Sequence, residues 1–346
     1  MNLLRVILFV LFICNYSACK KSSTENNNGG GTPPPPLVAG FAKGADISWL
    51  TQMEAAGKKF YNSSGAEQDC MLILKNLGMN TIRLRVWVDP AGGWNNKADV
   101  LAKSTRAKNL GMRIMIDFHY SDTWADPGHQ AKPSAWSAQD FATLKTSLYN
   151  HTADVLMTLK NNGITPEWVQ VGNETNDGLL WPDGKASTNM SNFAQLINTG
   201  YDAVKTASPT SKVIVHISNG HDNSLFRWIF DGLKNNGGKW DVIGMSLYPN
   251  AGNWSGMNSQ CLINMNDMVA RYNKEIMIVE VGMSWDSPVE TKAFLADLIT
   301  KTNSVTANKG PGVLYWEPEA YGNWQGYTLG AFDNSGKPTE ALNAFK

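Results

Sequence analysis

Two glutamates of this sequence stand where apolar runs end, and such a pair is suited to hydrolysing a glycosidic bond. Glu280 follows the apolar residues 276–279, and Glu174 lies just beyond the largely apolar run 168–172. A buried carboxylate without a partner is costly. Glycoside hydrolysis uses two carboxyl groups, one to protonate the leaving oxygen and, in retaining enzymes, a nucleophile about 5 to 5.5 Å away. Structural ion pairs with arginines are the alternative for both glutamates.

The surroundings of the two glutamates must differ, because one has to hold a proton near neutral pH while the other stays ionised. Within residues 80–88, arginines alternate with aliphatic residues, so Arg83 can point to the face opposite its apolar neighbours. We predict that Arg83 keeps Glu280 charged and that Tyr248 donates a second hydrogen bond to it. Glu174 would then be the acid/base and Glu280 the nucleophile.

Other polar and aromatic residues gather near the ends of the same apolar runs. Tryptophan is favoured where a flat apolar face is needed beside a hydrogen-bonding edge, as on sugar rings. Core or loop packing is the alternative for each tryptophan, and a buried ion network with Asp46 or Asp117 is the alternative for Arg83. The candidates for substrate binding or support are Asp46, Arg83, His119, Asp122, Trp124, Asn173, His221, Tyr248, Trp316 and Trp324.

Short apolar runs alternate with longer helical stretches along the chain, which is typical of repeated βα units around a parallel sheet. The predicted strands are 41–47, 80–88, 113–119, 168–172, 212–217, 242–247, 275–281 and 312–316. The predicted helices are 66–77, 98–110, 140–161, 192–208, 225–235, 265–273 and 289–303.

Eight strands with helices between them predict an α/β fold, a single-domain (β/α)₈ TIM barrel with its chemistry at the carboxyl ends of the strands. The fourth and seventh strands of a closed barrel face each other, so Glu174 and Glu280 can converge on one bond. A doubly wound open sheet is the alternative, but no glycine-rich phosphate loop follows the first predicted strand.

Composition favours one large globular domain acting on a neutral substrate. The chain has 346 residues, 42% of them hydrophobic and 17% charged, and its formal net charge is zero. A balanced charge gives no electrostatic footprint for nucleic acid or anionic polymers. We therefore expect no nucleic-acid partner, and we expect a monomer.

The amino terminus has the features of a bacterial export signal. Arg5 precedes the apolar run 6–13, which is too short to span a bilayer, and small residues then precede Cys19. The segment 16–19 resembles a lipobox, so residues 1–18 are predicted to be a lipoprotein-type signal peptide with Cys19 as the lipidated residue. A plain secreted protein is the alternative. The polar, low-complexity residues 19–36 would be a flexible tether, and 37–346 the catalytic domain.

That arrangement predicts an exported protein, on the outer membrane or cell surface of a bacterium, which meets the membrane only through its lipid. In the predicted catalytic domain, Cys70 and Cys261 are the only cysteines, too few for a disulfide scaffold or a zinc site. They are either bridged or buried free thiols. The five histidines form no H-x-H or H-E-x-x-H motif, so we expect no catalytic metal and no cofactor.

Six short motifs surround these candidates. They are GADIS at 44–48, IRLRVW at 82–87, DFHYSDTWADP at 117–127, VGNE at 171–174, SLYP at 246–249 and YWEP at 315–318. These motifs resemble those of the arabinogalactan endo-β-1,4-galactanases, glycoside hydrolase family 53. The eleven-residue segment 117–127 is the most specific of them, and the resemblance runs from about residue 44 to 345.

The resemblance implies retaining endo-hydrolysis of the β-1,4-galactosidic linkages in the (arabino)galactan side chains of pectin, with galacto-oligosaccharides as further ligands. It implies Glu174 as acid/base, Glu280 as nucleophile and Asn173 as the residue that bonds the 2-hydroxyl of the sugar at the cleavage point. Residues 281–288 run directly into the next predicted helix, so we expect no calcium-binding loop there. The alternatives are an endo-glycosidase of the same clan acting on a β-mannan or β-glucan, and a tethered protein that binds glycans without cutting them.

Overall fold

Eight parallel strands close into a barrel in this computed structural model, which describes residues 40–346. The strands follow one another around the barrel in chain order, and the last pairs with the first. The barrel strands are β1 (Ala42–Asp46), β2 (Thr81–Val86), β3 (Arg113–Phe118), β4 (Trp168–Val171), β7 (Lys212–Ile217), β8 (Val242–Leu247), β9 (Glu275–Val281) and β10 (Gly312–Trp316). The predicted (β/α)₈ barrel is confirmed.

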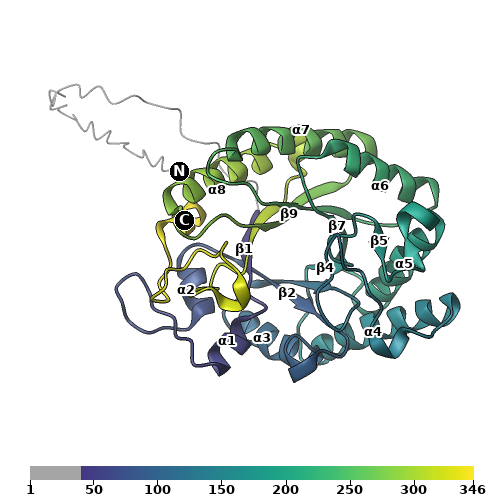
Figure 1. Cartoon of the computed structure of the whole chain (residues 1–346), viewed down its shortest axis with the longest axis horizontal. Coiled ribbons are helices and arrows are strands. Elements are labelled where there is room, and N and C mark those ends of the chain that lie inside the picture. The colour runs from purple at the N-terminus through teal and green to yellow at the C-terminus, as the bar shows by residue number, and fades with distance from the viewer. Residues whose placement is uncertain (1–39) are drawn as a thin grey trace, which may run out of the picture. The chain divides into compact units, whose positions relative to one another are not determined.

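Helices surround the strands (Figure 1). They are α1 (Leu50–Ala55), α2 (Cys70–Asn76), α3 (Lys97–Asn109), α4 (Phe141–Asn161), α5 (Ala186–Ala207), α6 (Asn223–Asn235), α7 (Trp254–Tyr272) and α8 (Pro288–Asn303). A short 3₁₀ helix, η5 (Glu340–Phe345), follows β10 in place of the α-helix expected after the eighth strand. A small hairpin of β5 (Gly178–Leu179) and β6 (Gly184–Lys185) lies between β4 and α5.

Two apolar layers hold the barrel together. The larger layer fills the space between strands and helices, because alternate strand residues such as Ile276 and Ile278 face outward and are fully buried there. The smaller layer fills the barrel interior, with Ala42, Met115, Trp168, Ile214, Val242, Met277, Val279 and Leu314. The barrel is therefore a packed core, and a site can form only at its ends.

The interior changes from apolar to polar toward the carboxyl ends of the strands. In β3, Asp117 follows Met115 on the same face, and in β4, Gln170 follows Trp168. Both polar residues are fully buried. This polar layer lies between the apolar interior and the end of the barrel where the loops after the strands meet.

Cys70 and Cys261 are both buried and free, which settles the alternative left open by the sequence. Within residues 40–346, no helix is both long and apolar enough to cross a membrane. The predicted signal peptide, the lipidated Cys19 and the tether lie outside the described residues.

Candidate active site

Glu174 stands on a strained turn just beyond β4. The strand ends at Val171, Gly172 adopts a φ of 84°, and Glu174 itself adopts a φ of 44°, a left-handed conformation that costs free energy for a residue with a side chain. The carboxylate accepts a hydrogen bond from the Ser246 hydroxyl of β8, with Oγ 2.7 Å from Oε1. The turn therefore aims the carboxylate across the end of the barrel.

Glu280 reaches the barrel interior because of a register irregularity between β8 and β9. Met277 and Val279 face the interior and Ile276 and Ile278 face the helices, so strict alternation would turn Glu280 outward. Pairing along β8 jumps from Met245–Ile278 to Ser246–Glu280, which leaves Val279 as an extra residue. Such a bulge redirects the side chains that follow it, and Glu280 accordingly points into the site.

The two glutamates line one cavity of about 280 Å³, and an oxygen of each lies within 4.8 Å of the other. This spacing matches the separation of about 5 to 5.5 Å typical of retaining glycosidases rather than the roughly 6.5 to 9.5 Å of inverting ones. The cavity is lined by His119, Trp124, Ala125, Asp126, Asn173, Glu174, Tyr248, Glu280 and Trp316. We call it the glutamate cavity.

Glu280 forms an ion pair with a guanidinium and accepts a hydrogen bond from a phenol. Arg83 Nη2 lies 2.8 Å from Oε1, and the Tyr248 hydroxyl donates to Oε2 at 3.0 Å. Arg83 is fully buried and also pairs with Asp46 and Asp117, so the ion network considered for it and the contact with Glu280 are both present.

Burial raises the pKa of both carboxyls above the usual range of a glutamate, while the positive charge of Arg83 lowers the pKa of both. Such a close pair titrates as a unit and retains a proton near neutral pH. The direct contacts decide which member holds the charge. Glu280 has the guanidinium and the phenol, whereas Glu174 has the neutral hydroxyl of Ser246.

A hydrogen-bonded chain supports Glu174 from below. His216 Nε2 lies 2.6 Å from Ser246 Oγ, and His216 Nδ1 lies 2.9 Å from Gln170 Nε2. Burial holds the pKa of His216 well below its usual range, so the ring is neutral. A neutral imidazole that donates through Nε2 leaves the Ser246 proton free to point at Glu174.

The other predicted residues in the cavity have defined supports. Asn173 donates to the Ala125 carbonyl at 2.7 Å, and its Oδ1 accepts from Arg83 at 3.0 Å. His119 Nε2 lies 2.9 Å from an Asp117 oxygen. Trp316, at the end of β10, is half-buried against the core.

Besides Asp46 and Arg83 of the ion network, three predicted residues do not line the cavity. Asp122 accepts from the backbone N–H groups of Asp89 and Ser134, which fixes the loop after β3. His221 and Trp324 each have a buried ring nitrogen without a hydrogen-bond partner among the described residues, and neither lines the glutamate cavity. A supporting role for Asp122 is therefore structural, and roles for the other two in binding stay predictions.

The sequence analysis did not select Gln170, His216 or Ser246, although all three contact the site. Each is a lone polar residue inside an apolar strand, β4, β7 or β8 respectively. A polar side chain in such a strand must find a buried partner. That signal was available, but which partner each would find depends on the register of the closed barrel.

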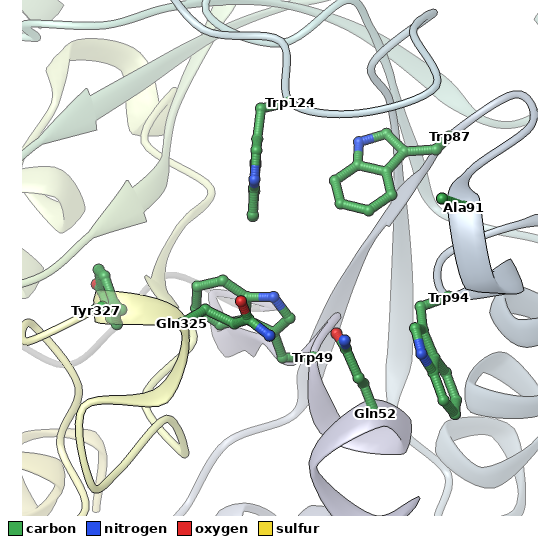
Figure 2. Close-up of a pocket in the computed structure, with 9 residues that line it drawn as sticks. Trp49, Gln52, Trp87, Ala91, Trp94, Trp124, Gln325 and Tyr327 are labelled. Atoms are coloured by element: carbon green, nitrogen blue, oxygen red, sulfur yellow. The ribbon is translucent and has the colours of Figure 1, made fainter. Parts of the chain in front are cut away.

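A second cavity of about 380 Å³ adjoins the first and shares Trp124 with it. Figure 2 shows its tryptophans arriving from separate segments around one space. Its lining consists of Trp49, Gln52, Trp87, Ala91, Trp94, Trp124, Gln325, Gly326 and Tyr327. We call it the tryptophan cavity. Aromatic faces beside amide groups form the kind of surface that binds sugar rings.

Among the described residues, one group offers three metal-ligand atoms close together, and it is Glu174, His216 and Glu280. The hydrogen bond between His216 and Ser246 and the ion pair between Arg83 and Glu280 account for this closeness. The buried guanidinium of Arg83, 2.8 Å from Glu280 Oε1, also places a positive charge beside this group, which disfavours a metal cation there. The group is best explained as a carboxyl pair.

Comparison with known proteins shows the family of this chain. The model of glycosyl hydrolase family 53 matches residues 42–345. The chain is 37% identical to a probable arabinogalactan endo-beta-1,4-galactanase A of Neosartorya fischeri, over 80% of this chain and 83% of the relative. It is 34% identical to an arabinogalactan endo-beta-1,4-galactanase of Thermothelomyces thermophilus, over 88% and 98%. A solved fungal beta-1,4-galactanase superposes with a TM-score of 0.82 at 34% identity, covering 90% of this chain and 99% of that one.

Proposed function

This chain belongs to glycosyl hydrolase family 53 and is an endo-β-1,4-galactanase, and we propose that it cleaves galactan with retention of configuration, using Glu174 and Glu280. The observation that carries the mechanism is the approach of the two carboxyl groups to within 4.8 Å in one cavity. An inverting enzyme needs room for a water molecule between its carboxylates, and this spacing leaves none.

In the first half of the reaction, the Glu280 carboxylate attacks the anomeric carbon while Glu174 gives its proton to the glycosidic oxygen. The bond from the anomeric carbon to that oxygen breaks, and the shortened chain departs as an alcohol. Glu280 is then joined to the sugar through an ester bond. Arg83 and Tyr248 favour the charged form of Glu280 before attack.

In the second half, Glu174 is a carboxylate and takes a proton from an incoming water molecule. The water oxygen attacks the anomeric carbon and releases Glu280, which restores both groups to their starting states. Two inversions at one carbon return the original β configuration. Asn173, held by Arg83 and the Ala125 carbonyl, is proposed to hydrogen-bond the 2-hydroxyl of the sugar at the cleavage point.

The substrate we propose is the neutral β-1,4-galactan of pectic arabinogalactan side chains. Family membership supports this choice, as do the zero formal charge of the chain and the aromatic walls of both cavities. Neutral sugars offer hydroxyl groups and flat apolar faces, which are the features that such walls bind.

The Gln variants of the two glutamates test the roles. Glu174→Gln and Glu280→Gln each remove an ionisable group at nearly constant shape, so each should lower kcat on galactan by roughly 10³-fold or more with the fold intact. Reducing-end assays on galactan and circular dichroism would measure both. Near wild-type turnover in either variant would contradict the assignment.

A panel of neutral polysaccharides tests the substrate. The wild-type enzyme should release reducing ends from β-1,4-galactan much faster than from β-mannan or β-glucan. Faster release of reducing ends from β-mannan or β-glucan would show that this polysaccharide, and not galactan, is the substrate. Intact oligosaccharide after long incubation would instead indicate a glycan-binding protein.

We also propose that the enzyme is an exported lipoprotein, anchored through Cys19 on the outer membrane or cell surface and acting as a monomer. The proposal is supported by the amino-terminal sequence, in which an apolar run and small residues precede Cys19, and by the polar tether that follows.

A further inference from the structure

Arg85, on β2, is a fully buried cation surrounded by indole rings. Its Cζ lies 5.1 Å from the ring centroid of Trp49, 5.1 Å from that of Trp87 and 4.4 Å from that of Trp124. All three distances fall within the range of about 6 Å in which a guanidinium is attracted to an aromatic face. The proposed mechanism gives Arg85 no task.

The charge of Arg85 has one carboxylate partner, Glu317, which is also fully buried. Glu317 accepts from the backbone N–H of Trp49 as well, at 3.1 and 3.2 Å to its two oxygens. The Nε and Nη2 atoms of Arg85 have no hydrogen-bond partner among the described residues. Part of the stabilisation of this buried guanidinium must therefore come from the indoles.

The three indoles also contact one another. Trp87 and Trp124 lie 5.2 Å apart between centroids at an interplanar angle of 87°, and Trp49 and Trp124 lie 5.6 Å apart at 78°. These edge-to-face contacts are the favoured geometry of aromatic pairs. The rings come from three different segments, the loops after β1, β2 and β3, so no single element holds them in place.

All three indoles line the tryptophan cavity (Figure 2), and Trp124 lines the glutamate cavity as well. We propose that Arg85 is a positioning residue, which holds Trp49, Trp87 and Trp124 as preformed walls that bind a galactose unit of the chain beyond the units being cleaved. The inference rests on the proposed function, because it takes galactan as the ligand.

Preformed walls affect binding more than chemistry. If the indoles were free to change rotamer, each would have to be ordered when the sugar binds, and that cost would weaken binding. The carboxyl pair would keep its own supports, since these are Ser246, Tyr248 and Arg83 and do not include Arg85. Loss of Arg85 should therefore raise KM for long chains and leave kcat nearly unchanged.

The test uses Arg85→Met and Arg85→Lys in the full chain, with β-1,4-galacto-oligosaccharides of increasing length. Arg85→Met should raise KM about tenfold for chains long enough to reach the tryptophan cavity, with kcat within about threefold of wild type. Arg85→Lys keeps the charge and should lie between Arg85→Met and wild type. Near-ultraviolet circular dichroism should report the altered packing of the indoles in both.

Arg113→Met is the matched control. Arg113 lies at the other end of the barrel, at the start of β3, with its Cζ 4.4 Å from the Trp168 ring centroid and Glu167 as its ion-pair partner. It has the same kind of partners but no contact with either cavity, so KM should stay at the wild-type value for every chain length.

Arg85→Met leaves the Glu317 carboxylate buried without its cation, which destabilises the fold. The double variant Arg85→Met/Glu317→Gln removes both charges and so avoids this unpaired carboxylate. A wild-type KM for long chains in folded Arg85→Lys or in the double variant would overturn the inference, as would an equal change of KM at all lengths. If the wild-type enzyme cleaves no galactan, the proposed function fails instead. If it cleaves galactan and the variants keep its KM, only the role of Arg85 fails.

Discussion

At the scale of single residues, the site depends on giving two identical side chains different surroundings. Glu280 contacts a buried guanidinium and a phenol, whereas Glu174 contacts a serine hydroxyl backed by a neutral histidine. Burial raises the pKa of both carboxyls, so the pair keeps one proton near neutral pH. His216 is neutral, so Glu174 has no positive charge beside it to match the one that Arg83 gives Glu280. The negative charge of the pair therefore stays on Glu280.

Ser246→Ala tests the support of Glu174. The hydrogen bond from Ser246 lowers the pKa of Glu174, although burial raises it overall. Removing the hydroxyl should therefore raise that pKa further. Because the acid must be protonated, activity is lost as the pH rises through its pKa, so the alkaline limb of kcat/KM should move to higher pH.

The pH profile of kcat/KM on galactan measures this shift. Ser259→Ala is the control, since the Ser259 hydroxyl bonds only to a carbonyl within α7 at the surface. A Ser246→Ala limb that stays in place or moves to lower pH would contradict the support proposed for Glu174.

At the scale of elements, the bulge in β9 is what makes Glu280 available. Without the extra residue Val279, alternation along the strand would place Glu280 against the surrounding helices. Room for Val279 comes from Gly244 on the neighbouring strand β8. A Cβ at Gly244 would lie 2.8 Å from Ile214 Cγ2 and 3.3 Å from Val279 Cγ2.

Gly244→Ala should therefore crowd the bulge. Overpacking a rigid interior costs about 1–3 kcal/mol, and moving Val279 would misplace Glu280, so both the free energy of unfolding and kcat should fall. Denaturant unfolding and turnover on galactan measure the two effects.

Gly256→Ala is the contrasting variant for Gly244→Ala. Gly256 lies in α7 with nothing within 4 Å of an added Cβ, so alanine should be neutral or stabilising there, by up to about 1 kcal/mol. Unchanged stability and turnover in Gly244→Ala would show that the bulge does not need the space.

The strands could be predicted from sequence because their apolar runs are short and bounded. β7, β8, β9 and β10 have the predicted bounds, and the others differ by at most two residues at an end. The predicted start of α7 was wrong, since the helix begins at Trp254 rather than at residue 265. The first turns of α7 are rich in serine, asparagine and glycine. These residues have low helix propensity, and tertiary packing overrides this propensity here.

The glutamate pair could be placed from sequence because strand order in a barrel decides which strand ends meet. The bulge in β9 could not, because a run of apolar residues followed by Glu280 has the same appearance with or without it. The partners of Ser246 and His216 likewise depend on the register between strands, which apolar periodicity does not determine.

At the scale of the whole molecule, one barrel serves both cavities. The segments after β1, β2, β3 and β10 build the tryptophan cavity, and β2, β4, β8 and β9 or their ends hold the carboxyl pair and its supports. Trp124 belongs to both linings, so a polymer bound along the indoles, as we propose, would extend to the carboxyl pair. The packed barrel interior keeps the whole site at one end of the fold.

Cys19→Ala tests the proposed anchor on this scale. In a bacterial host, the wild-type chain should incorporate labelled fatty acid and sediment with the membrane, whereas Cys19→Ala should stay unlabelled. Galactanase activity of the variant should be retained, because Cys19 precedes the whole barrel. An unlabelled wild-type chain in the soluble fraction would contradict the lipoprotein assignment and leave the catalytic account untouched.

The most direct test of the central claim is the anomeric configuration of the first product. Proton nuclear magnetic resonance of a β-1,4-galacto-oligosaccharide digest, read before mutarotation, separates the two anomers. Two carboxyl groups within 4.8 Å predict that the new reducing end appears as the β anomer, which then equilibrates with the α form. Initial appearance of the α anomer would show inversion and would contradict the role of Glu280 as the nucleophile.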